Sequence, residues 1–166
     1  AGVSKIVFAS SNHTQHAYTM GKTTLSEDLS YVKKHGLVKL DDPPAPDSLY
    51  GVSKLFGEDL GRYYSRFYGI KFVCLRIGTA FGVHWTGLMM KGDKPTRDHL
   101  RALYLSKRDL IDIFDKALQI DADYIVAYAV SDNKPAVFDL TETRKKLGFN
   151  PNDNSQTYLQ KHDLTH

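Results

Sequence analysis

Residues 48–56, Ser-Leu-Tyr-Gly-Val-Ser-Lys-Leu-Phe, open a stretch in which apolar residues recur every three or four positions. This spacing predicts an α-helix with one apolar stripe. Tyr50 and Lys54 are four residues apart, so they share a face of that helix. Three prolines precede the stretch, and Asp47 or Ser48 can cap its first turn, so the helix is expected to begin almost at Tyr50.

Two apolar runs flank this helix in the sequence. The run Lys5-Ile-Val-Phe-Ala9 ends in Ser10-Ser11, and the run Lys71-Phe-Val-Cys-Leu-Arg-Ile-Gly78 follows the helix. We interpret both as strands of an open α/β sheet. Ligands of such sheets lie beyond the carboxyl ends of the strands, so Ser11 is expected at a ligand site.

Tyr50, Lys54 and Ser11 together suit the transfer of a proton to or from a substrate hydroxyl. The Lys54 ammonium would favour the phenolate form of Tyr50 by charge attraction, and Ser11 could hydrogen-bond the same substrate oxygen. A Tyr four residues before a Lys is, taken alone, usually a half-buried ring beside a solvated charge. The ordered set of strand, serines, Pro-rich loop, helix and second strand favours a functional site.

That ordered set resembles the extended short-chain dehydrogenase/reductase family, which comprises NAD-dependent sugar and nucleotide-sugar epimerases, dehydratases and dehydrogenases. The family marks are Ser10-Ser11, Tyr50-x-x-x-Lys54, Leu75-Arg-Ile-Gly78, Ser106 to Asp109, and Phe138 to Phe149. Within the family, Ser11-Asn-His-Thr14 and residues 48–58 look most like the uronate dehydrogenases, which oxidise a hexuronic acid at its anomeric carbon.

The resemblance implies an α/β fold, namely the C-terminal part of a Rossmann-like doubly wound parallel sheet with a small substrate-side region. Residues 1–166 would form a single domain that starts at the family's fourth strand. The glycine-rich fingerprint Gly-x-Gly-x-x-Gly is absent from the sequence. About the first third of such an enzyme is therefore expected to be missing, and with it the residue that selects NAD over NADP. Gly57 and Gly61 lie inside the predicted helix, where we expect them to allow close packing.

The resemblance also assigns roles to individual residues. Ser11, Tyr50 and Lys54 would be catalytic, while Asn12 and His13 would contact the sugar. An arginine would grip the substrate carboxylate, a task that suits its bidentate geometry; Arg101 is the first candidate and Arg97 the alternative. Ile77 and Gly78, together with Tyr50 and Lys54, would contact the cofactor NAD.

The implied reaction is the NAD-dependent oxidation of a sugar hydroxyl, with a hexuronate as substrate. A nucleotide-sugar epimerase or dehydratase is one alternative, and a non-catalytic fragment without the cofactor half is another. Family members commonly dimerise through the Tyr helix. A homodimer is therefore expected, and Tyr63, Tyr64, Phe67 and Tyr68 are compatible with that contact or with a place in the core.

Composition excludes several other functions. The chain has 166 residues, 42% of them apolar and 11% aromatic, which is ordinary for a globular protein. The net charge of +3 is spread along the chain, so neither a nucleic-acid partner nor a membrane partner is expected. The sequence contains no apolar run of membrane-spanning length and no signal pattern, so a cytoplasmic protein is the default expectation.

Cysteine and histidine content add two further expectations. The single cysteine, Cys74, lies in the middle of a predicted strand, where a buried inert thiol is favoured over a nucleophile. His13-x-x-His16 is the closest pair among seven histidines, and without a cluster of further ligands no metal site is expected.

The remaining sequence continues the α/β pattern. A loop rich in glycine and charge is expected from Gly78 to about Arg97, followed by a helix over 107–118 and a buried strand over 124–130. A short helix from Thr141 to Leu147 is expected to end at Gly148.

Overall fold

A computed structural model describes residues 2–20, 29–80 and 93–163. The elements in chain order are β1 (Lys5–Ser11), the 3-10 helices η1 (Asn12–Thr14) and η2 (His16–Thr19), α1 (Ser30–His35), α2 (Leu49–Tyr68), β2 (Lys71–Ile77), β3 (Thr79–Ala80), α4 (Lys94–Ala102), β4 (Tyr104–Leu105), α5 (Lys107–Gln119), β5 (Tyr124–Ala129), α6 (Thr141–Leu147) and α7 (Ser155–Asp163).

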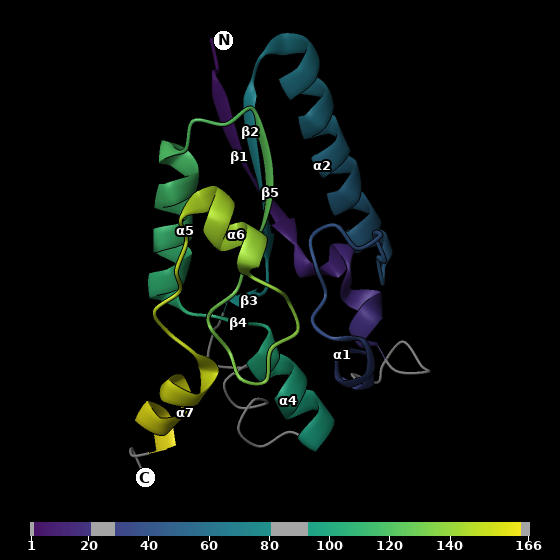
Figure 1. Ribbon diagram of the computed structural model, residues 1–166, viewed down its shortest axis with the longest axis vertical. Helices are drawn as coiled ribbons and strands as arrows, with labels where there is room; N and C mark the ends of the chain where they lie inside the picture. The colour runs from purple at the N-terminus through teal and green to yellow at the C-terminus, as the bar shows by residue number, and fades with distance from the viewer. Residues whose placement is uncertain (1, 21–28, 81–92, 164–166) are drawn as a thin grey trace.

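The central element is a parallel sheet in the order β1-β2-β5. Its register pairs Lys5 with Lys71 and Phe72 with Tyr124. Helix α2 covers one face of the sheet, and α5 and α6 cover the other (Figure 1). This arrangement confirms the predicted α/β class and the two strands on either side of the Tyr helix. A separate parallel pair, β3 with β4, lies below the sheet in Figure 1.

Two glycines set the distance between α2 and the sheet. A Cβ atom added at Gly57 would lie 2.4 Å from the Phe8 ring, and one added at Gly61 would lie 2.4 Å from the Phe72 ring. The rings on β1 and β2 therefore occupy the space that side chains at these helix positions would need. The expected close packing at both glycines is confirmed.

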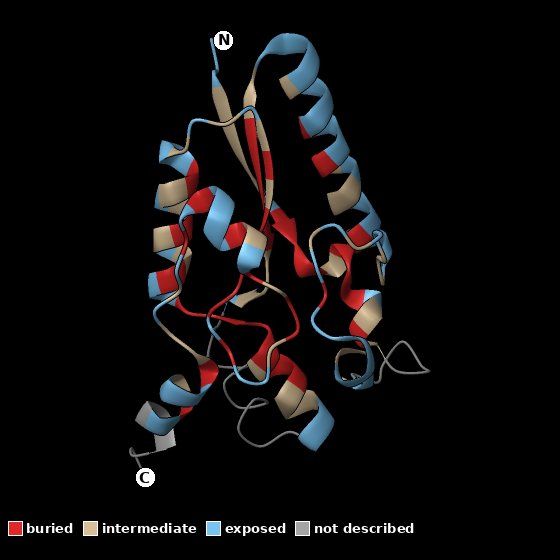
Figure 2. Ribbon diagram, in the orientation of Figure 1, coloured by how far each residue is buried: buried red, intermediate tan, exposed pale blue. Residues whose placement is uncertain are grey.

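The apolar stripe of α2 faces outward (Figure 2). Its exposed side chains are Leu49, Tyr50, Val52, Phe56, Leu60, Tyr63, Tyr64, Phe67 and Tyr68. The residues that α2 buries are Gly51, Glu58 and Gly61. Of the two placements left open for the four aromatic residues at the end of the helix, the structure shows the exposed one, because the glycine face is the side that fits closely against the sheet.

The opposite face of the sheet carries the main core. Val73, Leu75, Ile125 and Ala127 pack there with residues of α5 and α6. Cys74 is fully buried in the middle strand, and burial, with the Glu58 charge as a further cause, raises the pKa of its thiol to about 12. The expectation of a buried, inert cysteine is confirmed.

The second half of the chain differs from the expectation at one helix. The structure contains the predicted helix over 107–118, the strand over 124–130 and the short helix ended by Gly148. The predicted loop was expected to extend to about Arg97, but residues 94–102 form α4. Asp93 caps α4 by accepting a hydrogen bond from the Thr96 amide at 2.9 Å. Residues 81–92 of the predicted loop lie outside the described residues. Among the described helices, none combines the length and apolar character needed to cross a membrane.

Candidate active site

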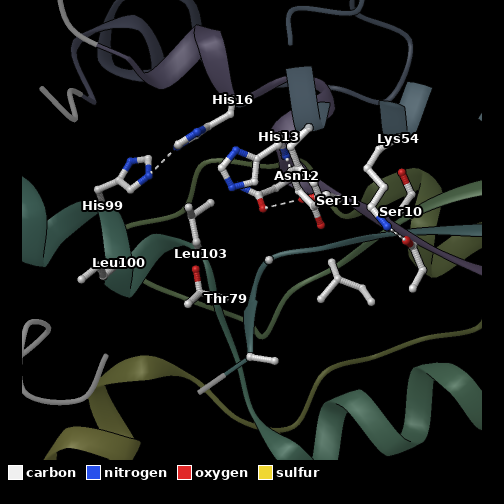
Figure 3. Close-up of a pocket in the computed structure, with 15 residues that line it drawn as sticks. Ser10, Ser11, Asn12, His13, His16, Lys54, Thr79, His99, Leu100 and Leu103 are labelled. Carbon is white, nitrogen blue, oxygen red and sulfur yellow. Dashed lines mark hydrogen bonds between the residues drawn. The ribbon is translucent and has the colours of Figure 1, made fainter. Parts of the chain in front are cut away.

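A cavity of about 400 Å³ opens beyond the carboxyl ends of β1 and β2 (Figure 3). Its described lining consists of Ala9, Ser10, Ser11, Asn12, His13, His16, Tyr50, Lys54, Ile77, Gly78, Thr79, Ala80, His99, Leu100 and Leu103. The structure thus brings together seven of the eight residues that were predicted for the site. Arg101 and its alternative Arg97 lie on α4 and are not among the described lining residues.

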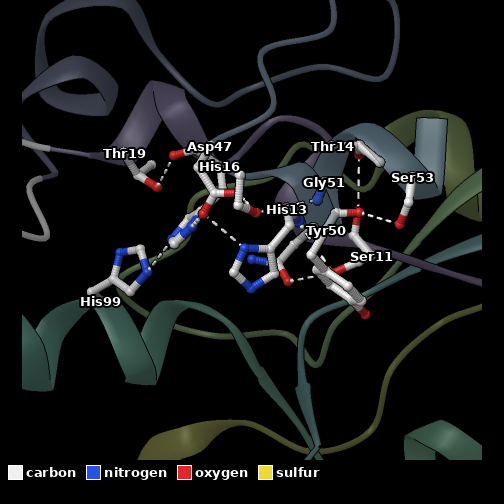
Figure 4. A network of polar contacts seen from close by, with 12 residues as sticks. Ser11, His13, Thr14, His16, Thr19, Asp47, Tyr50, Gly51, Ser53 and His99 are labelled. Atoms are coloured by element: carbon white, nitrogen blue, oxygen red, sulfur yellow. Dashed lines mark hydrogen bonds and ion pairs between the residues drawn. The ribbon is translucent and has the colours of Figure 1, made fainter. Parts of the chain in front are cut away.

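The start of α2 places Tyr50 at the cavity. The Ser48 hydroxyl caps the helix by accepting a hydrogen bond from the Gly51 amide at 3.2 Å. A Cβ atom at Gly51 would lie 2.4 Å from the His13 carbonyl oxygen, so only glycine allows this close approach. As a result, the Tyr50 and His13 rings meet edge to face, with centroids 5.4 Å apart (Figure 4). Tyr50 is 52% exposed.

Lys54 lies one turn further along α2, on the same face as Tyr50. Its Nζ atom donates a hydrogen bond to the Ala9 carbonyl oxygen at 2.7 Å and lies 5.3 Å from the centroid of the Tyr50 ring. The bond to β1 fixes the ammonium group beside the phenol. The arrangement therefore places a positive charge next to the hydroxyl-bearing ring, as the sequence pattern predicts.

Ser11 is buried at the last position of β1. Its hydroxyl oxygen caps η1 by accepting a hydrogen bond from the His13 amide at 3.2 Å, and it lies 3.4 Å from Asn12 Oδ1. The capping bond occupies a lone pair of the oxygen, and the long contact to Asn12 leaves the hydroxyl hydrogen able to turn to another acceptor. Ser11 can therefore donate a hydrogen bond into the cavity while its cap is kept.

A buried ion pair holds the strand end behind the cavity. Arg76 donates to both carboxylate oxygens of Glu58, from Nε at 3.0 Å and from Nη2 at 2.8 Å, and the Ser10 hydroxyl donates to Glu58 at 2.6 Å. Arg76 also donates to Gln15 at 2.7 Å. This network joins α2, β1 and β2. Sequence reasoning missed Glu58 as a buried partner; the signal for it is a carboxylate on the glycine face of the helix.

Three histidines that line the cavity, His13, His16 and His99, form a cluster with the carboxylate of Asp47 (Figure 4). Asp47 Oδ2 lies 2.7 Å from His13 Nδ1 and 2.6 Å from His16 Nδ1. On its other side, His16 Nε2 lies 2.7 Å from His99 Nε2. Sequence reasoning considered Asp47 only as a helix cap and gave His16 and His99 no role in the site.

Burial controls the charge of the cluster formed by the histidines and Asp47. Desolvation lowers the pKa of His99 to about 3, and the neighbouring His16 and His13 act in the same direction. Desolvation likewise lowers the pKa of His16 and outweighs its hydrogen bond to Asp47. Burial alone would raise the pKa of Asp47, but hydrogen bonds from His16, Ser48 and His13 lower it overall. At neutral pH Asp47 is therefore a carboxylate, and the His16 and His99 rings beside it are neutral.

The ligand atoms of His13, His16 and Asp47 lie within 4.8 Å of one another, a spacing that could also hold a metal ion. The separations of 2.7 and 2.6 Å between the ring nitrogens and Oδ2 are those of hydrogen bonds. Two ligands of a tetrahedral zinc ion, each about 2.0–2.1 Å from the metal, would be roughly 3.3 Å apart. Hydrogen bonding therefore accounts for the cluster as it stands.

The cavity is large enough for one end of a dinucleotide cofactor. Its volume of about 400 Å³ lies in the range of small-ligand sites. Ile77 and Gly78 line it at the end of β2. A Cβ atom at Gly78 would lie 2.3 Å from the Leu103 carbonyl oxygen, so packing alone already requires glycine there. Tyr50, Lys54, Ile77 and Gly78 could hold a nicotinamide, whereas the glycine-rich turn that binds the pyrophosphate is absent from the sequence.

Comparison with known proteins gives a family match over residues 1–117, to the NAD dependent epimerase/dehydratase family. Among curated proteins, the chain is 33% identical to an L-arabinose 1-dehydrogenase (NAD(P)(+)) of Haloferax volcanii, over 96% of this chain and 63% of that protein. It is 36% identical to an NAD-dependent glucose-6-phosphate dehydrogenase of the same organism, over 95% and 56%. It is 32% identical to a uronate dehydrogenase of Pseudomonas syringae pv. tomato, over 98% and 50%.

Solved structures give the same picture of the fold. A glucuronic acid dehydrogenase from Chromohalobacter salexigens superposes with a TM-score of 0.71 and 28% identity, and the match covers 99% of this chain and 53% of that one. The chain thus spans between about half and two thirds of the length of the relatives described here.

Proposed function

The chain belongs to the NAD dependent epimerase/dehydratase family, and from this premise we propose that it carries the catalytic residues of an NAD-dependent sugar dehydrogenase that oxidises a hexuronate at its anomeric carbon. The observation that carries the proposal is the convergence of Ser11, Tyr50 and Lys54 on one cavity, at the carboxyl ends of parallel strands.

Each of these residues has a separate task in the proposed reaction. Tyr50 takes the proton from the sugar hydroxyl, and the Lys54 ammonium supplies a positive charge beside the Tyr50 ring. Ser11 donates a hydrogen bond to the same substrate oxygen. Asn12 and His13 orient the sugar so that the carbon to be oxidised stays in place. When bound, NAD supplies the acceptor for the hydride that leaves this carbon.

A hexuronate is favoured by the match to uronate dehydrogenases in sequence and in fold. Its carboxylate would need a cationic partner, which we assign to Arg101 or Arg97. Helix α4 carries both arginines and contributes His99 and Leu100 to the cavity wall, so the partner would come from the same helix.

A second candidate substrate is an aldose without a carboxylate. The cavity has no arginine among its described lining residues, and Lys54 is the cation that faces it. The relatives named for L-arabinose and glucose 6-phosphate match the chain at similar identity. An epimerase reaction on a nucleotide sugar would use the same Tyr50 and Lys54 but would need a longer cleft.

The test is NAD reduction by the natural full-length protein, offered galacturonate, glucuronate, L-arabinose, glucose 6-phosphate and a nucleotide sugar in parallel. Turnover of the two uronates supports the hexuronate proposal, and Arg101→Ala or Arg97→Ala should then raise the uronate KM about tenfold or more, since a charge-assisted pair is lost. Turnover of L-arabinose or glucose 6-phosphate without turnover of the uronates supports the second candidate. If no sugar reduces NAD, the proposal of a dehydrogenase is wrong.

We also propose that the protein is a homodimer whose contact lies on α2. The exposed stripe of that helix holds Phe56, Leu60, Phe67 and several tyrosines on one side of the molecule. An exposed group of apolar and aromatic side chains of this kind is typical of a protein interface. Aromatic residues are enriched in such contacts, which favours a second copy of the chain as the partner.

A further inference from the structure

Asp47 determines which ring nitrogens of His13 and His16 carry a hydrogen. A carboxylate can only accept hydrogen bonds, and the two ring nitrogens that lie 2.7 and 2.6 Å from its Oδ2 atom must therefore both carry a hydrogen. Those nitrogens are Nδ1 of His13 and Nδ1 of His16. In a neutral imidazole with hydrogen on Nδ1, the Nε2 atom is left as an acceptor.

The other contacts of the histidine cluster agree with this assignment of hydrogens. His16 Nε2, as an acceptor, needs a donor, and His99 Nε2 lies 2.7 Å away. The side chains of Asp47 and His16 are only 7% and 10% exposed, so water does not compete strongly for these bonds. Asp47 is thus held by His16, which His99 contacts in turn, and by His13, whose side chain is 37% exposed.

The His13 ring faces the cavity. His13 is one of the lining residues, and its second nitrogen points away from Asp47 in Figure 4. The Tyr50 ring packs against it edge to face at 5.4 Å, and His16 lies 4.8 Å away on the other side. The ring is therefore held between two aromatic neighbours with only one free polar edge.

We propose that Asp47 is a positioning residue that holds His13 in the tautomer with hydrogen on Nδ1, so that Nε2 accepts a hydrogen bond from a hydroxyl of the sugar. The identity of the ligand as a sugar rests on the proposed function, whereas the tautomer does not. The same carboxylate accepts a hydrogen bond from Ser48, the N-cap of α2, at 2.8 Å. One side chain thereby fixes the orientation of His13 and the start of the helix that carries Tyr50.

The first experiment reads the tautomer directly, without NAD. The natural full-length protein is labelled with ¹⁵N-histidine, and long-range proton–nitrogen spectra are recorded at a pH where His13 is neutral. We expect His13 to show a protonated Nδ1 and an unprotonated Nε2, and the variant Asp47→Ala to move hydrogen onto Nε2. The matched control is Asp42→Ala, because Asp42 accepts from the Lys39 amide at 2.8 Å in the same loop.

A His13 ring that carries its hydrogen on Nε2 in the unmodified protein would overturn the proposal, and so would a pattern that Asp47→Ala leaves unchanged. If Asp47→Ala does not fold, the spectrum of the unmodified protein still decides. His16→Leu provides a second variant: it keeps the bond between Asp47 and His13, so the His13 tautomer should stay as it is.

The second experiment measures how the His13 tautomer affects binding of the sugar. In steady-state kinetics with the sugar that is turned over, Asp47→Ala should raise KM about tenfold, because one hydrogen bond to the substrate is lost, and kcat should fall less. A fall in kcat at unchanged KM would contradict a role in binding the sugar. If no sugar is turned over, the proposed function fails, while the NMR result still decides the tautomer.

Discussion

Tyr50 is the residue on which the proposed chemistry depends most directly. Tyr50→Phe removes the hydroxyl that takes the proton, and kcat should fall by about 10²-fold or more, as is usual for the loss of a general base. The ring packing against His13 would be kept, so the unfolding midpoint should hardly change. Tyr63→Phe on the same exposed face is the control, and it should turn over sugar at the parental rate.

His99 makes the folded state sensitive to acid. Its pKa is lowered from 6.5 to about 3, mainly by burial. The unfolded chain therefore binds more protons than the folded chain between these two values, and stability decreases as the pH falls from about 6.5 toward 3. At about pH 4.5 the loss should be roughly 2–3 kcal/mol. Asp47, whose pKa is also lowered, adds to the loss below about pH 4.

Urea unfolding at neutral pH and at about pH 4.5 measures this effect. His99→Leu should flatten the dependence on pH, whereas a change of the exposed His35 to glutamine should not. A free energy of unfolding that is the same at both pH values would contradict the assignment.

Local patterns predicted the residues that lie next to one another in sequence. Ser11 ends one strand, and Tyr50 and Lys54 share one helix face, so these three followed from local patterns, whereas Asn12 and His13 were added by the family resemblance. His16 and His99 are 83 positions apart, and their contact depends on how α4 returns to the strand end. No periodicity in either segment encodes that contact.

At the scale of elements, the fit between α2 and the sheet is set by glycine. Gly61→Ala would place Cβ 2.4 Å from Phe72 Cδ1 and 2.8 Å from its Cγ, the inner end of a buried ring. We expect a loss of about 1–3 kcal/mol from overpacking, although glycine to alanine in an open helix gains up to about 1 kcal/mol.

The rescue variant separates these two effects. Phe72→Leu should make Gly61→Ala less damaging, which a double-mutant cycle in urea would detect as a favourable coupling energy. Gly57→Ala should cost less than Gly61→Ala, because the Phe8 ring meets the added carbon with its outer end and can move. Additive effects at positions 61 and 72 would contradict the proposed contact.

The ion pair between Glu58 and Arg76 joins α2 to β2 inside the protein. Glu58→Gln keeps the shape but leaves the Arg76 charge buried and unpaired, and the expected loss is about 3–5 kcal/mol. Asp59→Asn is the matched control one residue along the helix. Asp59 pairs with Arg62 at 3.4 Å with both side chains exposed, so the change should cost less than about 0.5 kcal/mol. Equal effects on the urea midpoint would rule out a special role for the buried pair.

Helices and strands were predictable where one pattern dominates. The three strands of the main sheet and helices α2, α5 and α6 follow from apolar spacing and end signals such as Gly148. The direction of the α2 stripe did not follow, because small residues on the opposite face decide which side packs. Helix α4 was missed because its start, Asp93-Lys-Pro, follows a segment whose glycines and charges favour loop.

At the scale of the whole molecule, the exposed stripe of α2 predicts self-association. Light scattering of the natural full-length protein at micromolar concentration should give twice the mass of one chain. Phe56→Lys combined with Phe67→Lys should halve that mass, because two charges would be buried at the contact. Ile111→Lys on α5 is the control, since Ile111 is also exposed but on the other layer. A monomer in the unmodified protein would refute the dimer.

The rate at which the buried Cys74 thiol is alkylated reports how often the central sheet opens. This thiol lies in the middle of the central strand, shielded on both faces and held protonated, so an alkylating reagent can reach it only while the sheet is open. These 166 residues contain no other cysteine, so the labelling rate of the Cys74 thiol reports how often the sheet opens around β2. The opening of this sheet can therefore be measured without an engineered probe. The same measurement reports how long the sheet end that carries Ser11 stays closed.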